Sequence, residues 1–422
     1  MSTTDGSSQP PIPNPQSPLG YLFSLEQFGI KFGLQNISAI VAALGYPDRT
    51  FRSIHVAGTN GKGSVTAMAD AALRAAGHRT ARYTSPHLVD LAERFTIDGA
   101  PVSQGALVAA IADVRAAIES LRKRGILDVQ PTFFEVTTAA AFELFRRAHV
   151  EVAVLEVGLG GRLDATNVVT PVATAITSIA FDHQKYLGHS LREIAIEKAG
   201  IIKPGIPVVV GPLDAEAAAA IEAIASERGA EVIRATACDA DGFTVGLVGS
   251  HQRVNAGIAV RLLESVNRRG IAVPREAIAA GLADPQWPGR LDRRRLPDGR
   301  ELLLDAAHNP AGAMALASYL KADGRGRRPL VFAVMRDKQV REMLDVLLPE
   351  ASRLVVTAAS TPRSAEPAAL AAVAHELSPA LPIDVASSPA AALERAWSAS
   401  PDIVVAGSIF LLGDVLKLIN RS

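Results

Sequence analysis

A glycine-rich turn carries the first residues whose types and spacing could do chemistry. Residues 54–76 read IHVAGTNGKGSVTAMADAALRAA: an apolar strand, a turn, and a helix whose apolar residues recur at helical spacing. At a helix N-terminus, free backbone N–H groups and the helix dipole attract phosphate, and Gly58 and Gly61 let the backbone come close to it. Lys62 would reach the terminal phosphates and Ser64 a magnesium ion. The turn therefore predicts a nucleotide-phosphate site.

This turn departs from the common P-loop pattern at one position. Gly63 stands between Lys62 and the hydroxyl residue Ser64, which in most P-loops follows the lysine directly. The alternative is an ordinary strand-to-helix turn with a surface lysine. Three glycines, a lysine and a serine within GTNGKGS favour the phosphate site over that alternative.

Polar residues follow the next two apolar strands at the point where each strand ends. Glu156 ends VEVAVLE, while Asp182 and His183 come shortly after VATAITSIA. Ligands of open α/β sheets collect outside the carboxyl ends of the strands, so Glu156 is expected near the phosphate loop, where it could hold magnesium. The alternatives are a pairing of Glu156 with Arg162 and a purely structural role for His183.

A lysine on the apolar face of a short helix is the most unusual local feature. Ser190 and Glu193 form a capping box, and Lys198 falls at i+7 from Leu191, on the same face as Ile194. An amine there is costly to bury unless it is paired or neutral. It could snorkel to solvent. Alternatively, a neutral amine could add carbon dioxide and become a carbamate, an anionic oxygen ligand for a second magnesium ion.

Two loops could form a wall for an acceptor substrate. YTSPHLVDLAERF offers the hydroxyl of Ser85, and PTFFEVTT offers the flat rings of Phe133 and Phe134. Aromatic pairs usually belong to a core, but these two stand at a helix start and could stack on a planar ring.

A second polar cluster follows a strand in the last third of the chain. Asp305 could accept hydrogen bonds from ribose hydroxyls, and His308 could lie between two domains, with a helix cap by Asn309 as the structural alternative. Arg290 could cross to an ATP phosphate, and Ser408 occupies a comparable strand-end position, as do Asp337 and Lys338.

The elements that must position these residues alternate along the chain. From residue 21 onward, apolar strands alternate with helices across short connections, which predicts an α/β fold with mostly parallel sheets. In the first part we expect strands at 53–57, 150–157, 172–179 and 207–210 and helices at 104–122, 136–148, 191–199, 215–228 and 253–266. Residues 230–250 suggest a small antiparallel patch and 285–297 a linker. Beyond it, strands at 301–304, 330–334, 353–357, 383–386 and 403–406 predict a Rossmann-like domain.

The length and composition of the whole chain limit the class of protein to which it can belong. Its 422 residues are enough for two domains. We divide it into a disordered tail at 1–18, a P-loop ATP-binding domain at 19–290 and a Rossmann-like C-terminal domain at 291–422. Lysine plus arginine equals aspartate plus glutamate at 43 each, so no global charge favours nucleic acid or an anionic membrane. The single cysteine, Cys238, suits a reducing cytoplasm, and no apolar run approaches the length of a membrane span.

A series of motifs resembles one known family. GTNGKGS, SPHL with AERF, TFFE, LEVGLGGRLDATN, DHQKYLG, EKAGIIK, HQRVNA, WPGRL, DAAHNP, DK and GSIF occur in this order. The series is similar to the bifunctional dihydrofolate synthase/folylpolyglutamate synthase family of the Mur ligase superfamily. The resemblance implies an ATP-dependent amide ligase that adds L-glutamate to dihydropteroate and to glutamylated tetrahydrofolate through an acyl phosphate. It also implies two Mg²⁺ sites, small-molecule substrates and a monomer.

The resemblance further implies roles for individual residues. The catalytic set is Lys62, Lys198, His308 and Asp305. ATP contacts are Thr59, Asn60, Gly61, Lys62, Gly63, Ser64, Asn255, Arg290 and Asp305. Metal contacts are Ser64, Ser85, Glu156, His183 and Lys198 as a carbamate. Acceptor and glutamate contacts are Thr132, Phe133, Phe134, Glu135, Leu163, Asp164, Ala165 and Ser408, with His308 also near the glutamate.

Three other functions stay open at this point. LEQFGIKFGLQNI matches the usual pteroate-binding start only loosely, which leaves open a folylpolyglutamate synthase without the dihydropteroate step. A cell-wall ligase of the same superfamily would need a UDP-linked acceptor, and LEVGLGGRLDATN argues against it. A P-loop switch protein would hydrolyse nucleotide without ligating anything.

Overall fold

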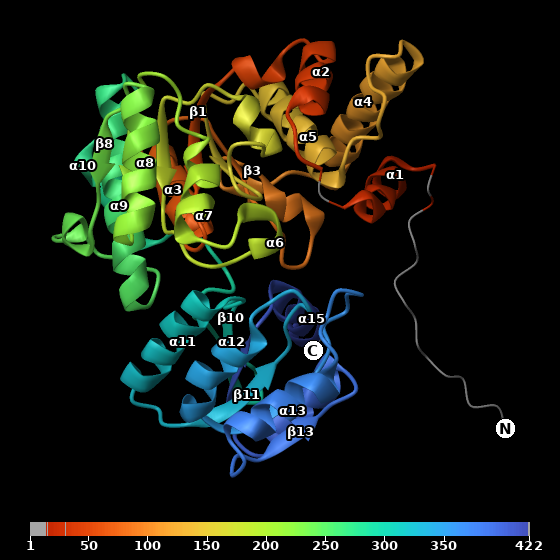
Figure 1. Cartoon of the computed structure of the whole chain (residues 1–422), viewed down its shortest axis with the longest axis vertical. Helices are drawn as coiled ribbons and strands as arrows, with labels where there is room; N and C mark the ends of the chain where they lie inside the picture. The colour runs from red at the N-terminus through yellow and green to blue at the C-terminus, as the bar shows by residue number, and fades with distance from the viewer. Residues whose placement is uncertain (1–13, 15, 30, 421–422) are drawn as a thin grey trace.

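The computed structural model describes residues 14, 16–29 and 31–420, which form two sheets with helices on both faces (Figure 1). The first sheet has the order β4-β3-β2-β5-β1-β6-β7-β8. Its strands are β1 (Arg52–Ala57), β2 (Thr80–Tyr83), β3 (Phe95–Ile97), β4 (Ala100–Pro101), β5 (Val152–Glu156), β6 (Ala173–Ile176), β7 (Val208–Val210) and β8 (Val232–Arg234). The predicted α/β class is confirmed.

Helices cover both faces of the first sheet because its strands are apolar on both sides. The helices of this part are α1 (Pro18–Ser24), α2 (Gln35–Ala43), α3 (Lys62–Ala75), α4 (Gln104–Lys123), α5 (Phe133–Arg147), α6 (Gln184–Leu187), α7 (Leu191–Ala199), α8 (Ala215–Glu227), α9 (Ser250–Arg268) and α10 (Arg275–Ala283). Along β5, Val152 and Val154 pack toward α3, α9 and α10, whereas Ala153 and Leu155 pack toward α4 and α5. This alternation is the period of two expected for a strand between two helical layers.

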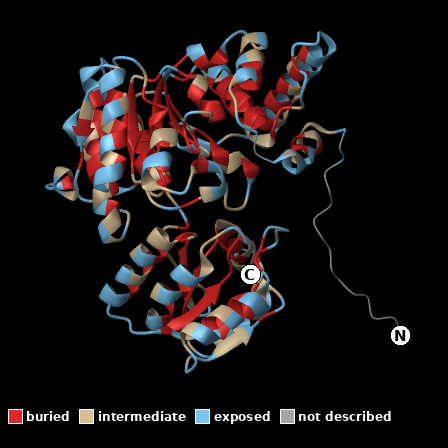
Figure 2. Ribbon diagram, in the orientation of Figure 1, coloured by how far each residue is buried: buried red, intermediate tan, exposed pale blue. Residues whose placement is uncertain are grey.

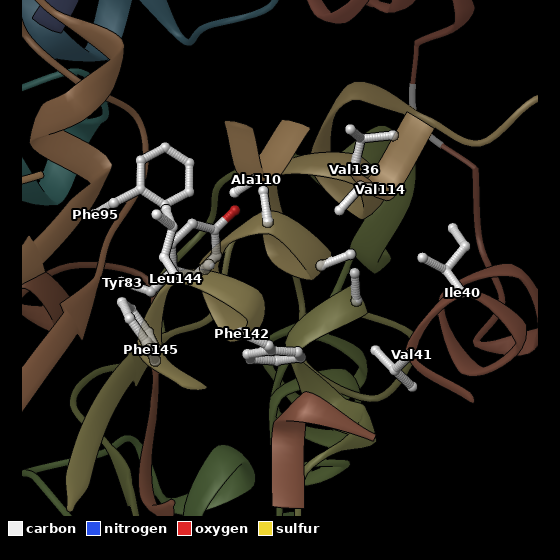
Figure 3. Close-up of a cluster of buried hydrophobic side chains, with 14 of the residues drawn as sticks. Ile40, Val41, Tyr83, Phe95, Ala110, Val114, Val136, Phe142, Leu144 and Phe145 are labelled. Carbon is white, nitrogen blue, oxygen red and sulfur yellow. The ribbon is translucent and has the colours of Figure 1, made fainter. Parts of the chain in front are cut away.

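An aromatic cluster fills the space between the sheet and helices α2, α4 and α5. Figure 3 shows Tyr83, Phe95, Phe142 and Phe145 among its fully buried members. The Tyr83 hydroxyl lies 2.8 Å from Thr137 Oγ1, which satisfies its one polar atom inside the core. The end of β2, two residues before Ser85, is therefore anchored in the buried core.

The antiparallel part of the first sheet lies at a different place from the one expected. β8 runs parallel to β7, so residues 230–250 form no antiparallel patch and continue instead into the short 3-10 helix η5 (Ala237–Ala240). The antiparallel strands are β3 and β4 at the opposite edge, next to β2. The prediction of a small antiparallel part is confirmed, and its expected position is wrong.

The second sheet has the order β13-β12-β11-β14-β10-β9 and is parallel except for β9. Its strands are β9 (Asp292–Arg295), β10 (Glu301–Asp305), β11 (Arg328–Phe332), β12 (Ala351–Val356), β13 (Ile383–Val385) and β14 (Asp402–Ala406). Its helices are α11 (Pro310–Ala322), α12 (Val340–Leu347), α13 (Pro367–Leu377), α14 (Pro389–Trp397) and α15 (Ile409–Ile419). Part of the expected linker is thus an edge strand, whose arginines pair with acids of its own domain.

Buried residues concentrate in the two sheets and the helix faces that cover them (Figure 2). In the described part of the chain, no helix is both long and apolar enough to cross a membrane. Residues 1–13 and 15 of the predicted tail lie outside the described residues, and α1 begins at Pro18. The last strand of the first sheet ends at Arg234 and the second sheet begins at Asp292, and the division at 290/291 stays a prediction.

Candidate active site

The glycine-rich turn joins the end of β1 to the first residue of α3, as predicted from the sequence. A Cβ atom on Gly58 would lie 1.9 Å from Thr177 Oγ1, so only glycine fits against the end of the neighbouring β6. Gly61 has φ +87° and faces the side chain of Asn255 on α9. The Thr59 amide donates to the Ser178 carbonyl oxygen at 2.8 Å. The loop is therefore clamped by two neighbouring elements.

Gly63, the departure from the common P-loop pattern, has a structural cause. A Cβ atom at this position would lie 2.1 Å from Cζ2 of Trp287, whose indole lies against the first turn of α3. Arg82 of β2 also lies against this indole, with its guanidinium carbon 5.2 Å from the ring centroid. Trp287 belongs to the segment between the two sheets, three residues before Arg290. The extra glycine thus makes room for a side chain of the connecting segment.

Lys62 lies over the turn that it follows. Its Nζ donates to the carbonyl oxygens of Gly58 at 3.0 Å and Thr59 at 3.2 Å. Burial lowers the pKa of Lys62, whereas the nearby carboxylates of Glu156 and Asp182 favour its charged form. The ammonium group therefore stands at the mouth of the loop, beside the acids predicted to share the site.

Glu156 ends β5 next to the glycine-rich turn and is buried. Burial raises the pKa of its carboxyl group, and the charge of Lys62 together with a hydrogen bond from the Ser85 amide at 3.3 Å opposes that rise. Arg162 pairs with Glu197 at 2.7 Å. The alternative in which Glu156 simply pairs with Arg162 is therefore wrong.

His183 stands at the N-terminus of the short helix α6 with φ +50°. Burial lowers its pKa to about 4, so its imidazole is neutral near pH 7 and keeps a lone pair for a ligand. Its Nε2 lies 3.5 Å from Nζ of Lys338, a residue of the second domain.

Lys198 is buried to 4% exposure, and its Nζ donates to the Gly58 carbonyl oxygen at 3.0 Å. Its head group therefore does not snorkel to solvent. Burial and the charge of Lys62 lower the pKa of Lys198 to about 7, so a substantial fraction of the amine is neutral near pH 7. A neutral amine beside the glycine-rich loop has the reactivity that a carbamate requires.

The donors present fit a magnesium ion that is held largely by a nucleotide. Among the described residues, no three His, Cys, Asp or Glu side chains group closely enough to hold a metal ion alone. Mg²⁺ typically takes one or two protein carboxylates and completes its octahedron with phosphate oxygens and waters. Buried Glu156, with the hydroxyls of Ser64 and Ser85 on neighbouring elements, is a donor set of that kind.

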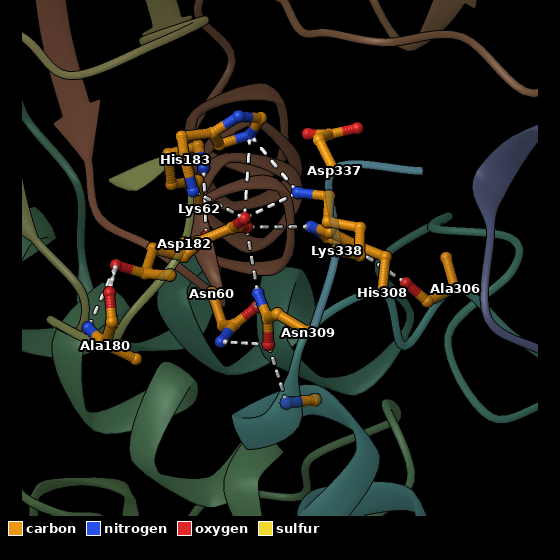
Figure 4. A network of polar contacts seen from close by, with 12 residues as sticks. Asn60, Lys62, Ala180, Asp182, His183, Ala306, His308, Asn309, Asp337 and Lys338 are labelled. Carbon is orange, nitrogen blue, oxygen red and sulfur yellow. Dashed lines mark hydrogen bonds and ion pairs between the residues drawn. The ribbon is translucent and has the colours of Figure 1, made fainter. Parts of the chain in front are cut away.

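A polar junction joins the two domains beside this site (Figure 4). Asp182 accepts hydrogen bonds from Lys338 Nζ at 2.5 Å and from Asn309 Nδ2 at 3.1 Å, and its Oδ2 lies 3.5 Å from His308 Nε2. The amides of Asn309 and Asn60 also exchange hydrogen bonds, at 3.0 and 3.2 Å. The junction therefore connects the phosphate loop and the His183 segment to the start of α11.

The pKa of Asp182 shows how strongly this junction favours the ionised acid. Burial alone would raise it, but the hydrogen bond from His308 and the charge of Lys338 outweigh burial and hold the pKa well below its usual range. Asn309 also accepts from the Gly312 amide at 2.9 Å, so it caps α11 as well as bridging the domains.

The other residues expected to contact the nucleotide come from three parts of the chain. Asp305 ends β10, is buried, and accepts hydrogen bonds from the amides of Leu291 and Ala307, both at 2.9 Å. Burial raises its pKa, and the charge of Arg290 opposes that rise. Arg290 also acts on Glu156, so its charge is felt in both domains. Asn255 donates to Gln252 at 2.9 Å on α9.

Several of the residues expected to form a wall for the acceptor and glutamate have side chains that already hold the fold together. Thr132 and Glu135 form a capping box that starts α5 at Phe133, three residues before the expected start. Asp164 is buried and holds the amides of Leu159 and Thr166, and Leu163 and Ala165 flank it. Ser408 caps α15 by accepting from Phe410.

The two rings differ in their surroundings. Phe134 packs against Tyr83, with ring centroids 5.9 Å apart, and its Cζ would lie 2.5 Å from a Cβ on Gly158. Phe133 contacts Phe23 at 6.1 Å between centroids and carries the guanidinium of Arg94 at 5.2 Å. Both rings are half-buried. Nothing in the sequence indicated that Trp287 and Thr177 lie against the glycine-rich turn or that Arg94 lies over Phe133, because only the folded chain brings these residues together.

Comparison with known proteins identifies a consistent set of relatives. Residues 289–409 match the family model described as Mur ligase, glutamate ligase domain. The chain is 33% identical to the dihydrofolate synthase/folylpolyglutamate synthase of Bacillus subtilis, over 93% of this chain and 96% of that one. It is 36% identical to the folylpolyglutamate synthase of Lacticaseibacillus casei, over 94% and 96%. The structure is similar to that of Mycobacterium tuberculosis folylpolyglutamate synthase complexed with ADP and AMPPCP, with a TM-score of 0.87, 35% identity and coverage of 96% and 98%.

Proposed function

The chain belongs to the dihydrofolate synthase/folylpolyglutamate synthase family of ATP-dependent glutamate ligases, and from this we propose that it joins L-glutamate both to dihydropteroate and to glutamylated tetrahydrofolate. The observation that carries the proposal is the convergence of Lys62, Glu156 and Lys198 on one turn, with the second domain joined to it through Asp182. A nucleotide switch needs the first part of this arrangement. A ligase also needs a second domain that delivers the amine beside the phosphate site.

The nucleotide would lie between the glycine-rich turn and the second domain. The turn from Thr59 to Ser64 would receive the phosphates through its backbone amides, with the Lys62 ammonium beside the γ-phosphate. Asp305 would accept from the ribose hydroxyls, Arg290 would pair with a phosphate, and Asn255 would contact the nucleotide from α9. The structure of the M. tuberculosis relative with ADP and AMPPCP supports this proposal.

Magnesium would be held by Glu156, His183, Ser64 and Ser85, with a carbamate on Lys198 serving a second ion. Bound there, the metal would supply positive charge next to the transferring phosphoryl group. Lys62 contributes charge of the same sign from the protein itself, and burial strengthens its effect.

The reaction proceeds by two displacements in this proposal. A carboxylate oxygen of the acceptor attacks the γ-phosphorus of ATP, which forms an acyl phosphate and releases ADP. The amine of glutamate then attacks the acyl carbon, loses a proton, and releases inorganic phosphate as the amide forms. Water would hydrolyse the acyl phosphate, so the domains must exclude it while glutamate binds. The Asp182 junction would hold the two domains together during this step.

The acceptor's pterin would lie along Thr132 to Glu135 and Leu163 to Ala165, and glutamate near His308 and Ser408. The Thr132/Glu135 capping box and the hydrogen bonds of Asp164 occupy those side chains, so backbone groups and the half-buried ring of Phe133 are the more available contacts on the acceptor wall. His308 is fixed by its Nδ1 contact with the Ala306 carbonyl oxygen at 2.8 Å, which turns Nε2 toward Asp182.

The test is ADP release by the purified full-length protein with ATP, Mg²⁺ and L-glutamate, with dihydropteroate and tetrahydrofolate supplied separately. The proposal expects ADP with each acceptor and a product heavier by one glutamate residue by mass spectrometry. ADP with tetrahydrofolate alone would show a folylpolyglutamate synthase without the first activity. ADP release that needs neither acceptor nor glutamate would overturn the ligase proposal.

The protein would work as a monomer in the cytoplasm. The single cysteine, Cys238, is exposed and free, which supports a reducing compartment such as the cytoplasm. Light scattering during size-exclusion chromatography should give a mass near the 44.2 kDa of one chain, and a dimer mass would contradict the monomer.

A further inference from the structure

A buried arginine, Arg94, lies over Phe133 of the proposed acceptor wall and forms no ion pair with any of the residues that the structure describes. Arg94 ends the 3-10 helix η3 (Leu91–Arg94) and is 9% exposed. Its carbonyl oxygen accepts from the Thr84 amide at 3.1 Å, which places Arg94 directly across from the residue before Ser85. The adjacent Glu93 is occupied, because its carboxylate accepts from the amides of Leu88, Val89 and Asp90.

Two neutral groups fix the guanidinium of Arg94. Its Nε donates to Nδ1 of His87 at 2.9 Å, and its central carbon Cζ lies 5.2 Å from the centroid of the Phe133 ring. Burial and the charge of Arg94 lower the pKa of His87 to about 4, so this imidazole accepts the hydrogen bond without contributing charge. The carboxylates that act electrostatically on Arg94 are those of Glu26, Glu156 and Glu93, and among the described residues none of them forms an ion pair with it.

A buried cation whose directly contacting side chains are neutral is costly unless an anion joins it. An arginine held at Nε still presents its outer N–H groups as a planar fork, which matches a carboxylate with two parallel hydrogen bonds. Phe133 belongs to the wall proposed above for the acceptor, so the acceptor is the ligand expected at this fork.

A glutamylated folate presents two carboxylates at its end, and only the γ-carboxylate reacts. The reacting group must reach the γ-phosphate beside Lys62, and the cations that act most strongly on Glu156 there are Lys62, Arg290 and Arg82. Arg94 is not one of these three cations. We propose that Arg94 binds the α-carboxylate of the acceptor's terminal glutamate, with His87 as the residue that positions it, so that the neighbouring γ-carboxylate points to the phosphate site. This inference rests on the proposed function and adds a specificity determinant to it.

The test compares acceptors that differ only in the α-carboxylate. Wild-type protein and Arg94→Gln are assayed for ADP release with tetrahydrofolate and with tetrahydrofolate α-carboxamide, in which a neutral amide replaces the α-carboxylate. Wild type should prefer the carboxylate about 10- to 100-fold in kcat/KM, the range expected for a charge-assisted hydrogen bond to a buried partner. Arg94→Gln should lose that preference while its KM for ATP stays within about twofold. The exposed Arg268→Gln serves as the matched control and should keep the preference.

The outcomes separate this inference from the ligase proposal and from misfolding. If Arg94→Gln keeps the full preference for the carboxylate, the inference is wrong. If wild type itself makes no distinction between the two acceptors, the inference is also wrong, even though ligation stands. His87→Leu should weaken the same preference without changing the KM for ATP. Failure of wild type to release ADP with any acceptor would instead remove the proposed function on which the inference depends.

Discussion

At the scale of single residues, the carbamate proposed for the buried Lys198 is the role that most needs a direct test. The Lys198 amine has a pKa of about 7 and donates to the Gly58 carbonyl oxygen, so it is both reactive and aimed at the phosphate loop. If it carries a carbamate, Lys198→Ala should lower kcat by about 100-fold or more, as loss of a preorganised charged group at the reacting centre does. Short carboxylic acids added to the assay should restore part of that loss.

The control for this variant is Lys123→Ala on the exposed end of α4, which should leave the rate unchanged. Full activity of Lys198→Ala in bicarbonate-free buffer would show that the carbamate has no role.

A second residue-scale prediction concerns His55 on β1. Burial and the charge of Lys203 lower its pKa to about 3, against an ordinary value of 6.5, and its Nε2 is 2.8 Å from Thr166 Oγ1. The unfolded chain therefore binds a proton between pH 6.5 and 3 that the folded chain does not, so stability falls as the pH drops through this window. His55 alone should cost about 2 kcal/mol of unfolding free energy between pH 7 and pH 5.

Urea unfolding of wild type and His55→Gln at the two pH values measures this contribution. The variant should lose less stability on acidification, by about 2 kcal/mol, whereas the exposed His149→Gln should behave as wild type. Equal losses in wild type and His55→Gln would contradict the assignment.

The residues that follow strand ends were the part of the site that the sequence predicted best. Glu156, His183 and Asp305 could be named from the sequence because the carboxyl ends of parallel strands meet at one edge, and the structure places all three beside the turn or the domain junction. The residues with which such side chains form hydrogen bonds could not be predicted from the sequence. Lys338 lies 156 positions from Asp182, and no local pattern encodes a contact across that distance.

At the scale of elements, the first turn of α3 and the connecting segment form one unit. Gly63→Ala should displace the Trp287 indole or the loop, because the new Cβ would lie 2.1 Å from Cζ2. We expect the dissociation constant of ATP to rise about tenfold or more, the cost of overpacking a filled contact. In a Trp287→Leu background, the same substitution should have little further effect on ATP binding.

This double-mutant cycle has a direct control in Gly105→Ala, because no atom lies within 4 Å of the added methyl group there. If Gly63→Ala weakens ATP binding equally in both backgrounds, Trp287 is not the reason for the glycine.

Long apolar elements were predictable, and short or charged ones were not. α7 was predicted with its observed bounds because its capping box and apolar spacing agree. β9 was read as a linker, since a DRRR edge strand held by ion pairs lacks the apolar alternation that marks a strand. Residues 230–250 contain the short parallel strand β8 followed by η5 and turns, and the true antiparallel strands, β3 and β4, are only three and two residues long.

At the scale of the whole molecule, the Asp182 junction holds two domains in register. Lys338→Met removes one of the charges that hold Asp182 ionised, while leaving the glycine-rich turn intact. We expect kcat to fall about 10- to 100-fold, the value of a charge-assisted hydrogen bond, with the dissociation constant of ATP unchanged. Lys338→Arg keeps the charge and should recover part of the rate.

The exposed Lys321→Met is the matched control and should retain the wild-type rate. A loss of ATP affinity as large as the loss of kcat would place Lys338 in nucleotide binding instead of domain registration.

The central claim for the molecule is that both domains serve one acyl phosphate chemistry. It is tested by supplying tetrahydrofolate whose terminal glutamate carboxylates carry ¹⁸O, together with ATP and L-glutamate, and measuring the isotope in the released phosphate. Because the attacking carboxylate oxygen stays with phosphorus when the amine displaces it, one ¹⁸O should appear in phosphate for each ligated product. Phosphate free of ¹⁸O, with ligated product present, would contradict the mechanism.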